Sequence, residues 1–397
     1  MPRRDRAAPE PPGAMEMRFL MLMVVALVLV TGAVLCALTF RIFNTVPPGS
    51  VAWAHSLQAY PEALCLDGSP GLYYLSPGFG EGWSKFLIFF EGGGFCSSHE
   101  DCAARAGEDL GSTRKDAAKR NLDHSVHPFF ARSETLNPLL YNWNHVFHRY
   151  CDGAYFSGYR RKPHKVGGVS LFYRGLRITE ALFADLASSH GLRNATDVVL
   201  SGCSAGGIRV FAHADALRAM VPATRARVVG FPDSGFYLDR SMFTPLKRFV
   251  VVGQNATALL SMRCLEDNRG VEERCLIGEV NAPYLQTPVF AWQSRYDLDQ
   301  RSCEMDGVCA AYPPCVRDYG EALSTQLRLR LLADARHGAF MDSCERHCQS
   351  PHLPSDDASS LTPTQAFAVW YAGLGRVFVQ HAPYPCPSCC STFLGVV

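Results

Sequence analysis

The stretch Val198-Val-Leu-Ser-Gly-Cys-Ser-Ala-Gly-Gly207 decides the fold. Within it, residues 202–206 fit the pattern G-x-S-x-G. The residues ahead of it, 196–200, are mostly apolar and β-branched, which predicts a buried strand. Residues 208–220 behind it carry apolar side chains at helical spacing. A strand, a sharp turn and a helix in this order are typical of a nucleophile elbow, which exposes a serine at the carboxyl end of a sheet. The alternative is a glycine-rich turn whose serine has no chemical role.

Other segments favour an α/β fold, because strand-like and helix-like patterns alternate along the chain. Residues 86–90, Phe-Leu-Ile-Phe-Phe, form a continuous apolar run, which is typical of a central strand. Further strands are expected at 145–150, 227–231 and 288–292, and helices at 174–190 and 361–373, the latter with Thr362 as its cap. Residues 100–140 and 300–320 lack periodicity and are expected to be loops around a site. The sequence therefore predicts a mostly parallel central sheet flanked by helices.

The composition is that of an ordinary globular protein. The chain has 397 residues, of which 48% are hydrophobic and 19% charged, and its formal net charge is +1. A charge so close to neutral gives no indication of a nucleic-acid partner. We expect one domain, at 61–397, preceded by a linker at 41–60 that contains two prolines and a glycine.

The amino-terminal segment predicts a membrane anchor. Residues 19–40 are uncharged and lie between Arg18 and Arg41. A helix of this length spans about 33 Å, enough for the hydrocarbon core of a bilayer. Basic residues in the tail at 1–18 place the amino end in the cytosol. We therefore expect a single-pass type II membrane protein, and the alternative is a cleaved signal peptide and secretion.

Either topology places the rest of the chain in the secretory pathway or outside the cell. Asn194-Ala-Thr and Asn255-Ala-Thr are glycosylation acceptors in such a compartment. The 16 cysteines also suit an oxidising environment. Disulfides are favoured over a metal site at 386–390, because no second cysteine pair or histidine cluster completes a tetrahedral zinc site. Since 15 cysteines lie beyond the apolar span, at least one should stay free, and Cys203 is the candidate.

An acyl-transferring serine needs hydrogen-bond donors for the oxyanion. Glu91-Gly-Gly-Gly94 directly follows the predicted strand at 86–90. This segment is similar to the H-G-G-G loop of lipases and esterases, with Glu in place of His. Ala205, which follows the serine, is expected to supply another N–H group.

The serine also needs a base and a carboxylate that orients it, in the order Ser, Asp or Glu, His along the chain. Three aspartates follow predicted strands, and chain order alone does not separate Asp233, Asp297 and Asp299. The histidines beyond them leave four candidates for the base, namely His337, His347, His352 and His381.

Several ordered motifs resemble the pectin acetylesterase family, whose relatives are the Notum-type carboxylesterases. These motifs are Leu64-Cys-Leu-Asp-Gly-Ser69, Glu91-Gly-Gly-Gly-Phe-Cys96, Tyr141-Asn-Trp-Asn144, Arg149-Tyr-Cys-Asp-Gly153, Tyr173-Arg-Gly175, Gly202-Cys-Ser-Ala-Gly-Gly207, Asp233-Ser-Gly-Phe236, Tyr296-Asp297 with Gln300, and Ser343-Cys344 with His347-Cys-Gln349. The cysteines in the elbow and in Cys-Asp-Gly favour the pectin branch over Notum.

The resemblance implies an α/β-hydrolase-like domain and a serine esterase without metal or organic cofactor. It implies Ser204 as nucleophile, Asp297 as acid and His347 as base. It also implies oxyanion donors at Gly93, Gly94 and Ala205, and a substrate contact at Phe95, where a tryptophan is expected in the plant-like motif.

The expected activity is the removal of O-acetyl groups from a pectin-like cell-wall polysaccharide. One alternative is a Notum-like O-deacylase of a lipid-acylated protein, which a deep apolar tunnel would favour. An inactive carbohydrate-binding relative is the alternative of a different class, and the loss of a triad residue would favour it.

Overall fold

The computed structural model describes residues 51–123, 125–348, 353–354, 361–386 and 390–391, together with helical residues at 21, 23–24 and 27–31. Residues 1–47 and 48–397 form two separate compact units. Most of the predicted span at 19–40 lies outside the described residues. Among the residues that are described, no helix is both long and apolar enough to cross a bilayer.

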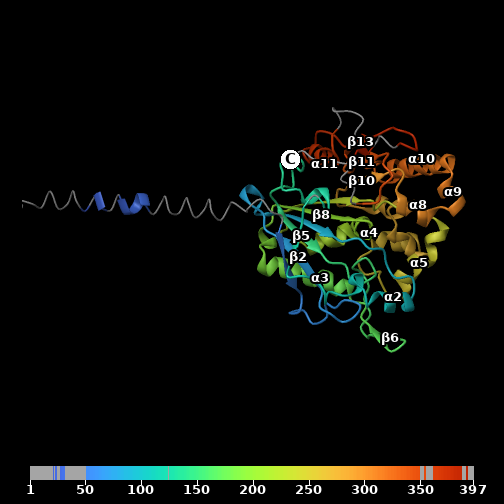
Figure 1. The fold of residues 1–397 in the computed structure, drawn as a ribbon, viewed down its shortest axis with the longest axis horizontal. Coiled ribbons are helices and arrows are strands. Elements are labelled where there is room, and N and C mark those ends of the chain that lie inside the picture. The colour runs from blue at the N-terminus through green and yellow to red at the C-terminus, as the bar shows by residue number, and fades with distance from the viewer. Residues whose placement is uncertain are drawn as a thin grey trace, which may run out of the picture. The chain divides into compact units, whose positions relative to one another are not determined.

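A ten-stranded sheet organises the larger unit (Figure 1). In spatial order its strands are β13 (Val377–Val379), β11 (Gly338–Asp342), β10 (Phe290–Ser294), β9 (Arg227–Asp233), β8 (Asp197–Cys203), β3 (Lys85–Phe90), β5 (Asn144–His148), β2 (Leu72–Ser76), β1 (Val51–Ser56) and β4 (Lys119–Asn121). The strands from β13 to β5 run parallel, and β2, β1 and β4 extend the sheet antiparallel.

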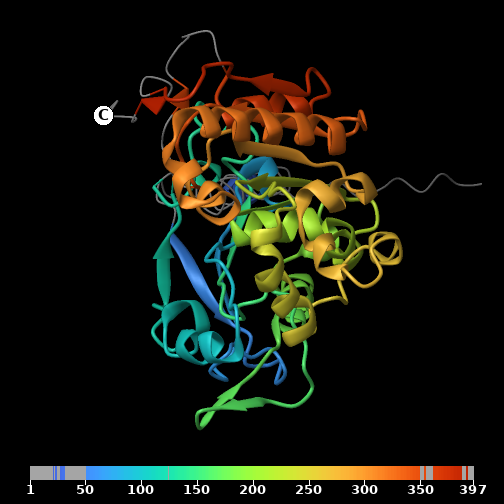
Figure 2. The same ribbon diagram turned by 90° about the vertical axis from the view of Figure 1, so that its right-hand side faces the viewer.

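Helices and short strand pairs surround the sheet. The helices are α2 (His99–Arg105), α3 (Gly175–Ser189), α4 (Ala205–Met220), α5 (Thr244–Arg248), α6 (Met262–Asp267), α7 (Gly278–Asn281), α8 (Leu298–Glu304), α9 (Gly307–Ala311), α10 (Pro313–Arg330) and α11 (Pro363–Tyr371). Two strand pairs lie apart from the main sheet, β6 (His164–Val166) with β7 (Val169–Leu171), and β12 (Leu353–Pro354) with β14 (Cys390–Ser391). Figures 1 and 2 both show the β6–β7 hairpin projecting from the body of this unit.

Apolar residues cover both faces of the sheet. On β3, Phe86, Ile88 and Phe90 pack into the same core as α3 and α4. Leu87 and Phe89 alternate with them and pack into the core on the other face, which includes α11. A strand buried on both faces carries no polar alternation, which explains the continuous apolar run in the sequence.

The predicted α/β architecture is confirmed. Each predicted strand and helix is present within a few residues of its expected limits, and Thr362 caps α11 through the N–H of Gln365. The linker prediction at 41–60 does not hold at its end, because residues 51–56 form β1 and pair with β2 and β4. The loop predictions are wrong in part. Residues 300–320 include most of α8, all of α9 and the start of α10, and residues 100–140 include most of α2 and all of β4. Cysteines and charges interrupt the apolar pattern there, although tertiary packing still stabilises helices.

Candidate active site

The elbow is formed as the sequence predicts. Ser204 lies between β8 and α4 with φ 55° and ψ −121°, a backbone conformation that non-glycine residues rarely adopt. A Cβ at Gly202 or Gly206 would lie 2.6 or 2.0 Å from the carbonyl oxygen of Phe90. Glycine is therefore required at both positions, because β3 runs directly against the turn. This close approach presents Ser204 at the carboxyl end of the parallel strands.

The glycine loop after β3 lies against this elbow. A Cβ on Gly92 would be 3.2 Å from the Cβ of Ser204. Gly93 and Gly94 have φ of 141° and 64°. The carbonyl of Gly94 accepts a hydrogen bond of 2.7 Å from the Tyr150 hydroxyl, and the carbonyl of Gly93 accepts one from Arg105. The loop is thus fixed through its carbonyl groups.

Three backbone donors near Ser204 are unused. In the part of the chain that the structure describes, the N–H groups of Gly93, Gly94 and Ala205 donate to no acceptor. Ala205 begins α4, whose first N–H groups have no partner within the helix and favour negative charge. These groups can donate to a substrate oxygen.

Glu91 anchors the start of the loop. Its Oε2 accepts the backbone N–H of Tyr150 at 2.9 Å and pairs with the guanidinium of Arg149. In this structure, therefore, the glutamate at the position of the lipase histidine holds the loop against β5.

His347 is oriented by Asp297. The imidazole Nδ1 lies 2.8 and 3.0 Å from the two carboxylate oxygens of Asp297. Asp297 is fully buried and caps α8, accepting the N–H groups of Asp299 and Gln300 at 3.0 Å. Burial lowers the pKa of His347, but the hydrogen bond and charge of Asp297 outweigh it, so this pKa lies above its usual value.

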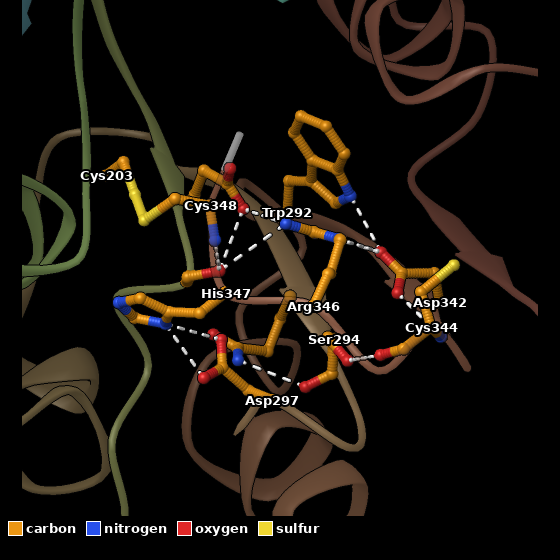
Figure 3. Close-up of polar contacts among 12 residues, drawn as sticks. Cys203, Trp292, Ser294, Asp297, Asp342, Cys344, Arg346, His347 and Cys348 are labelled. Atoms are coloured by element: carbon orange, nitrogen blue, oxygen red, sulfur yellow. Dashed lines mark hydrogen bonds and ion pairs between the residues drawn. A yellow bond between two sulfur atoms is a disulfide. The ribbon is translucent and has the colours of Figure 1, made fainter. Parts of the chain in front are cut away.

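A buried ion-pair network holds the loop that carries His347 (Figure 3). Arg346 pairs with Asp233 at 2.8 Å and with Asp342 at 2.9 Å, and its guanidinium lies 4.0 Å from the ring centroid of Trp292. Burial alone would raise the pKa of Asp233, but Arg346 and His127 hold it at about 2. Asp233, one of the three candidate acids, thus contacts Arg346 and His127 (3.1 Å).

A disulfide joins the elbow to the same loop. Cys203 precedes the serine and is bonded to Cys348, which follows His347 (Figure 3). The expectation that Cys203 is the free thiol is therefore wrong. Its partner lies 145 residues away in sequence, and pairing over such a distance depends on the fold. The free cysteine among the described residues is Cys303.

The remaining histidine candidates lie elsewhere or outside the described residues. His337 is buried before β11, where its Nδ1 accepts the N–H of Val289 at 3.0 Å. Burial lowers its pKa to about 4. It lies at the amino-terminal edge of the parallel strands, opposite the elbow. His381 does not line the cavity that contains Ser204 and His347, and His352 lies outside the described residues.

A cavity of about 450 Å³ brings these parts together. It is lined by Phe89, Glu91, Gly92, Gly93, Gly94, Arg120, Val126, His127, Phe147, Cys203, Ser204, Asp299, His347 and Cys348. No hydrogen bond joins Ser204 to His347 within the described chain, and the imidazole Nε2 instead lies 3.6 Å from Asp299. Catalytic hydrogen bonds are often loose before substrate binds.

Phe95 does not line the cavity. Its ring packs against Tyr155 and Phe243 at centroid distances of 5.0 and 5.4 Å. Within the described ranges, no group of three or more His, Cys, Asp or Glu side chains is placed to hold a metal ion.

Arg120 and the covalent bond at Cys348 are among the features of the cavity that sequence reasoning missed. The only signal for the second was the position of His347 between cysteines. Nothing local distinguished Arg120, because it lies on a short polar strand in a segment expected to be a loop.

Comparison with known proteins assigns the family. The pectinacetylesterase family model matches residues 53–391. The chain belongs to the pectinacetylesterase family. It is 31% identical to pectin acetylesterase 4 of Arabidopsis thaliana over 83% of this chain and 85% of that protein. Pectin acetylesterase 7 of the same plant is 29% identical over 82% and 88% of the two chains.

Notum proteins are also similar. The palmitoleoyl-protein carboxylesterase NOTUM of Schmidtea mediterranea is 29% identical over 61% of this chain and 48% of that protein. The structure of the Wnt deacylase Notum from Drosophila superposes with a TM-score of 0.73 at 25% identity, covering 86% of this chain and 99% of the other. The protein thus has a Notum-like α/β-hydrolase fold, and as a pectinacetylesterase family member it is a carboxylic-ester hydrolase.

Proposed function

We propose that the protein is a serine esterase that removes O-acetyl groups from a pectin-like polysaccharide, with Ser204, His347 and Asp297 as its triad. The observation that carries the proposal is that Ser204 and His347 line one cavity while Asp297 holds the imidazole from behind. The names of the plant relatives support the choice of an acetylated polysaccharide.

In the proposed mechanism, His347 Nε2 accepts the proton of the Ser204 hydroxyl as its oxygen attacks the ester carbonyl. Asp297 keeps the Nδ1 proton in place and stabilises the imidazolium. The oxyanion accepts hydrogen bonds from the N–H groups of Gly93, Gly94 and Ala205.

The tetrahedral intermediate collapses, and the alcohol leaves with the proton from His347. Water, deprotonated by the same imidazole, then attacks the acyl-enzyme and releases the carboxylic acid. Because Nε2 makes no hydrogen bond to the serine hydroxyl in the described structure, the two side chains must approach each other when substrate binds.

Ser204→Ala in the full-length protein tests the nucleophile. With p-nitrophenyl acetate as substrate, kcat should fall on the order of 10⁶-fold, as in other enzymes with a serine triad. Ser188→Ala, an exposed serine of α3, is the control and should keep full activity. A folded Ser204→Ala variant with near-normal kcat would assign the chemistry to another group, and a wild-type protein without esterase activity would favour the inactive carbohydrate-binding alternative.

A Notum-like O-deacylase of a lipid-acylated protein is the second candidate, supported by the structural similarity to the Wnt deacylase. A series of p-nitrophenyl esters of increasing acyl length separates the two. An acetylesterase should lose kcat/KM steadily as the chain grows, whereas a lipid deacylase should prefer long chains.

We also propose that the domain works in the secretory pathway or outside the cell. The disulfides support an oxidising compartment, and both acceptor asparagines, Asn194 and Asn255, are exposed. Amino-terminal sequencing of the mature protein distinguishes a type II anchor at 19–40, which leaves Met1 near the terminus, from a cleaved signal.

A further inference from the structure

Arg120 lines the same cavity as Ser204. It lies on β4, the edge strand of the sheet, opposite Ala52 of β1. Its side chain is 36% exposed. A guanidinium in a cavity built around a neutral ester needs an explanation, because the proposed acyl transfer does not require a cation at this place.

The contacts of Arg120 leave its donors unused. Its guanidinium lies 4.4 Å from the ring centroid of Phe147, which fixes its position by a cation–π contact. The nearest carboxylate oxygen, Glu91 Oε1, is 3.6 Å away, beyond hydrogen-bond length. Among the described residues, Arg120 has no hydrogen-bond acceptor for its side chain.

Glu91 does not fully neutralise Arg120. The other oxygen of Glu91 is bound by the guanidinium of Arg149 and by the backbone N–H of Tyr150. The charge of this carboxylate is therefore shared between two arginines, of which Arg149 is the closer and the more buried. Arg120 keeps a planar fork of N–H donors available on the cavity side.

We propose that Arg120 binds a carboxylate on the alcohol part of the substrate and so selects acylated sugar acids over neutral sugars. A guanidinium matches a carboxylate in a bidentate geometry and binds it more strongly than it binds neutral groups. In a polymer of sugar acids, the acylated ring and its neighbours each carry a carboxylate, so an anion always lies close to the ester. This inference rests on the proposed esterase function and assigns Arg120 a specificity role rather than a part in the chemistry.

The test compares two acetylated oligosaccharides of equal length, one of galacturonic acid and one of galactose, as substrates of the full-length enzyme. The wild type should show a higher kcat/KM for the acidic oligosaccharide. Arg120→Gln should reduce this preference about 10- to 100-fold, the strength of a charge-assisted hydrogen bond. Arg120→Lys should be intermediate, since it keeps the charge without the planar fork.

Arg114→Gln is the matched control. Arg114 is 67% exposed, pairs with Asp67 at 2.7 Å and does not line the cavity. This variant should leave the preference unchanged. The activity of Arg114→Gln on p-nitrophenyl acetate should also stay the same, because Arg114 does not line the cavity.

A binding measurement gives an independent readout. The unacetylated galacturonic acid trimer should inhibit the wild type more strongly than the galactose trimer, and added salt should weaken only the first effect. Salt-independent inhibition of equal strength by both trimers would overturn the inference even if Arg120→Gln did not fold. An equal loss on both acetylated oligosaccharides in Arg120→Gln would also overturn it. Failure of the wild type on p-nitrophenyl acetate would instead refute the esterase proposal itself.

Discussion

Removing the disulfide between Cys203 and Cys348 should both destabilise the protein and lower its esterase activity. The bond closes a segment with a sequence separation of 145 residues. Because a cross-link restricts the unfolded chain more as the loop lengthens, the double variant Cys203→Ala/Cys348→Ala should lose about 5 kcal/mol of unfolding free energy. Urea denaturation followed by circular dichroism measures this loss.

The same change should reduce turnover. The two cysteines are the immediate neighbours of Ser204 and His347, so their bond limits the separation of these side chains. A misplacement of reacting groups by about 1 Å can cost about 100-fold in rate. We expect a fall of that order in kcat on p-nitrophenyl acetate, at a temperature where the variant is folded.

Cys309→Ala/Cys315→Ala is the matched control. This disulfide has a sequence separation of 6 and lies outside the cavity. Its removal should cost only about 2 kcal/mol by the same loop-closure relation, with kcat unchanged. Equal stability losses in the two double variants would refute the loop-length reasoning. A normal kcat in the folded Cys203→Ala/Cys348→Ala protein would refute the positioning argument.

Three further predictions concern the catalytic base and its protonation. His347→Ala should abolish esterase activity. His337→Ala should keep kcat and lower only the urea midpoint of unfolding, because it leaves the N–H of Val289 unpaired. The reverse pattern would assign the role of the base to His337. Since His347 must be neutral to accept a proton and its pKa is raised, kcat/KM should be full above that pKa and fall as the pH drops through it. Asp299→Asn removes a charge that raises the pKa of His347, so the fall of kcat/KM at acidic pH should move to lower pH. An unchanged pH profile would show that Asp299 does not affect the pKa of the imidazole.

The local sequence was sufficient to predict the structure where the residues of a short stretch determine its backbone conformation. The elbow could be predicted because a Cβ atom at Gly202 or Gly206 would clash with the end of β3, so only glycine fits at these two positions. The run at 86–90 predicted a central strand, since burial on both faces excludes polar residues. The Thr362 cap was also predictable from local sequence, because the hydroxyl of Thr362 accepts a hydrogen bond from the N–H group three residues later.

The sequence by itself therefore determined the α/β class, the elbow at Ser204 and the glycine loop, all of which depend on residues close together in the chain. Only the tertiary structure decided which carboxylate is hydrogen-bonded to Nδ1 of His347, which cysteine is bonded to Cys203, and that Arg120 lines the cavity. Each of these depends on loops at the ends of different strands meeting at one edge of the sheet. Chain order places such loops at that edge, but it does not determine which side chains touch there, because packing over a hundred or more residues sets their distances.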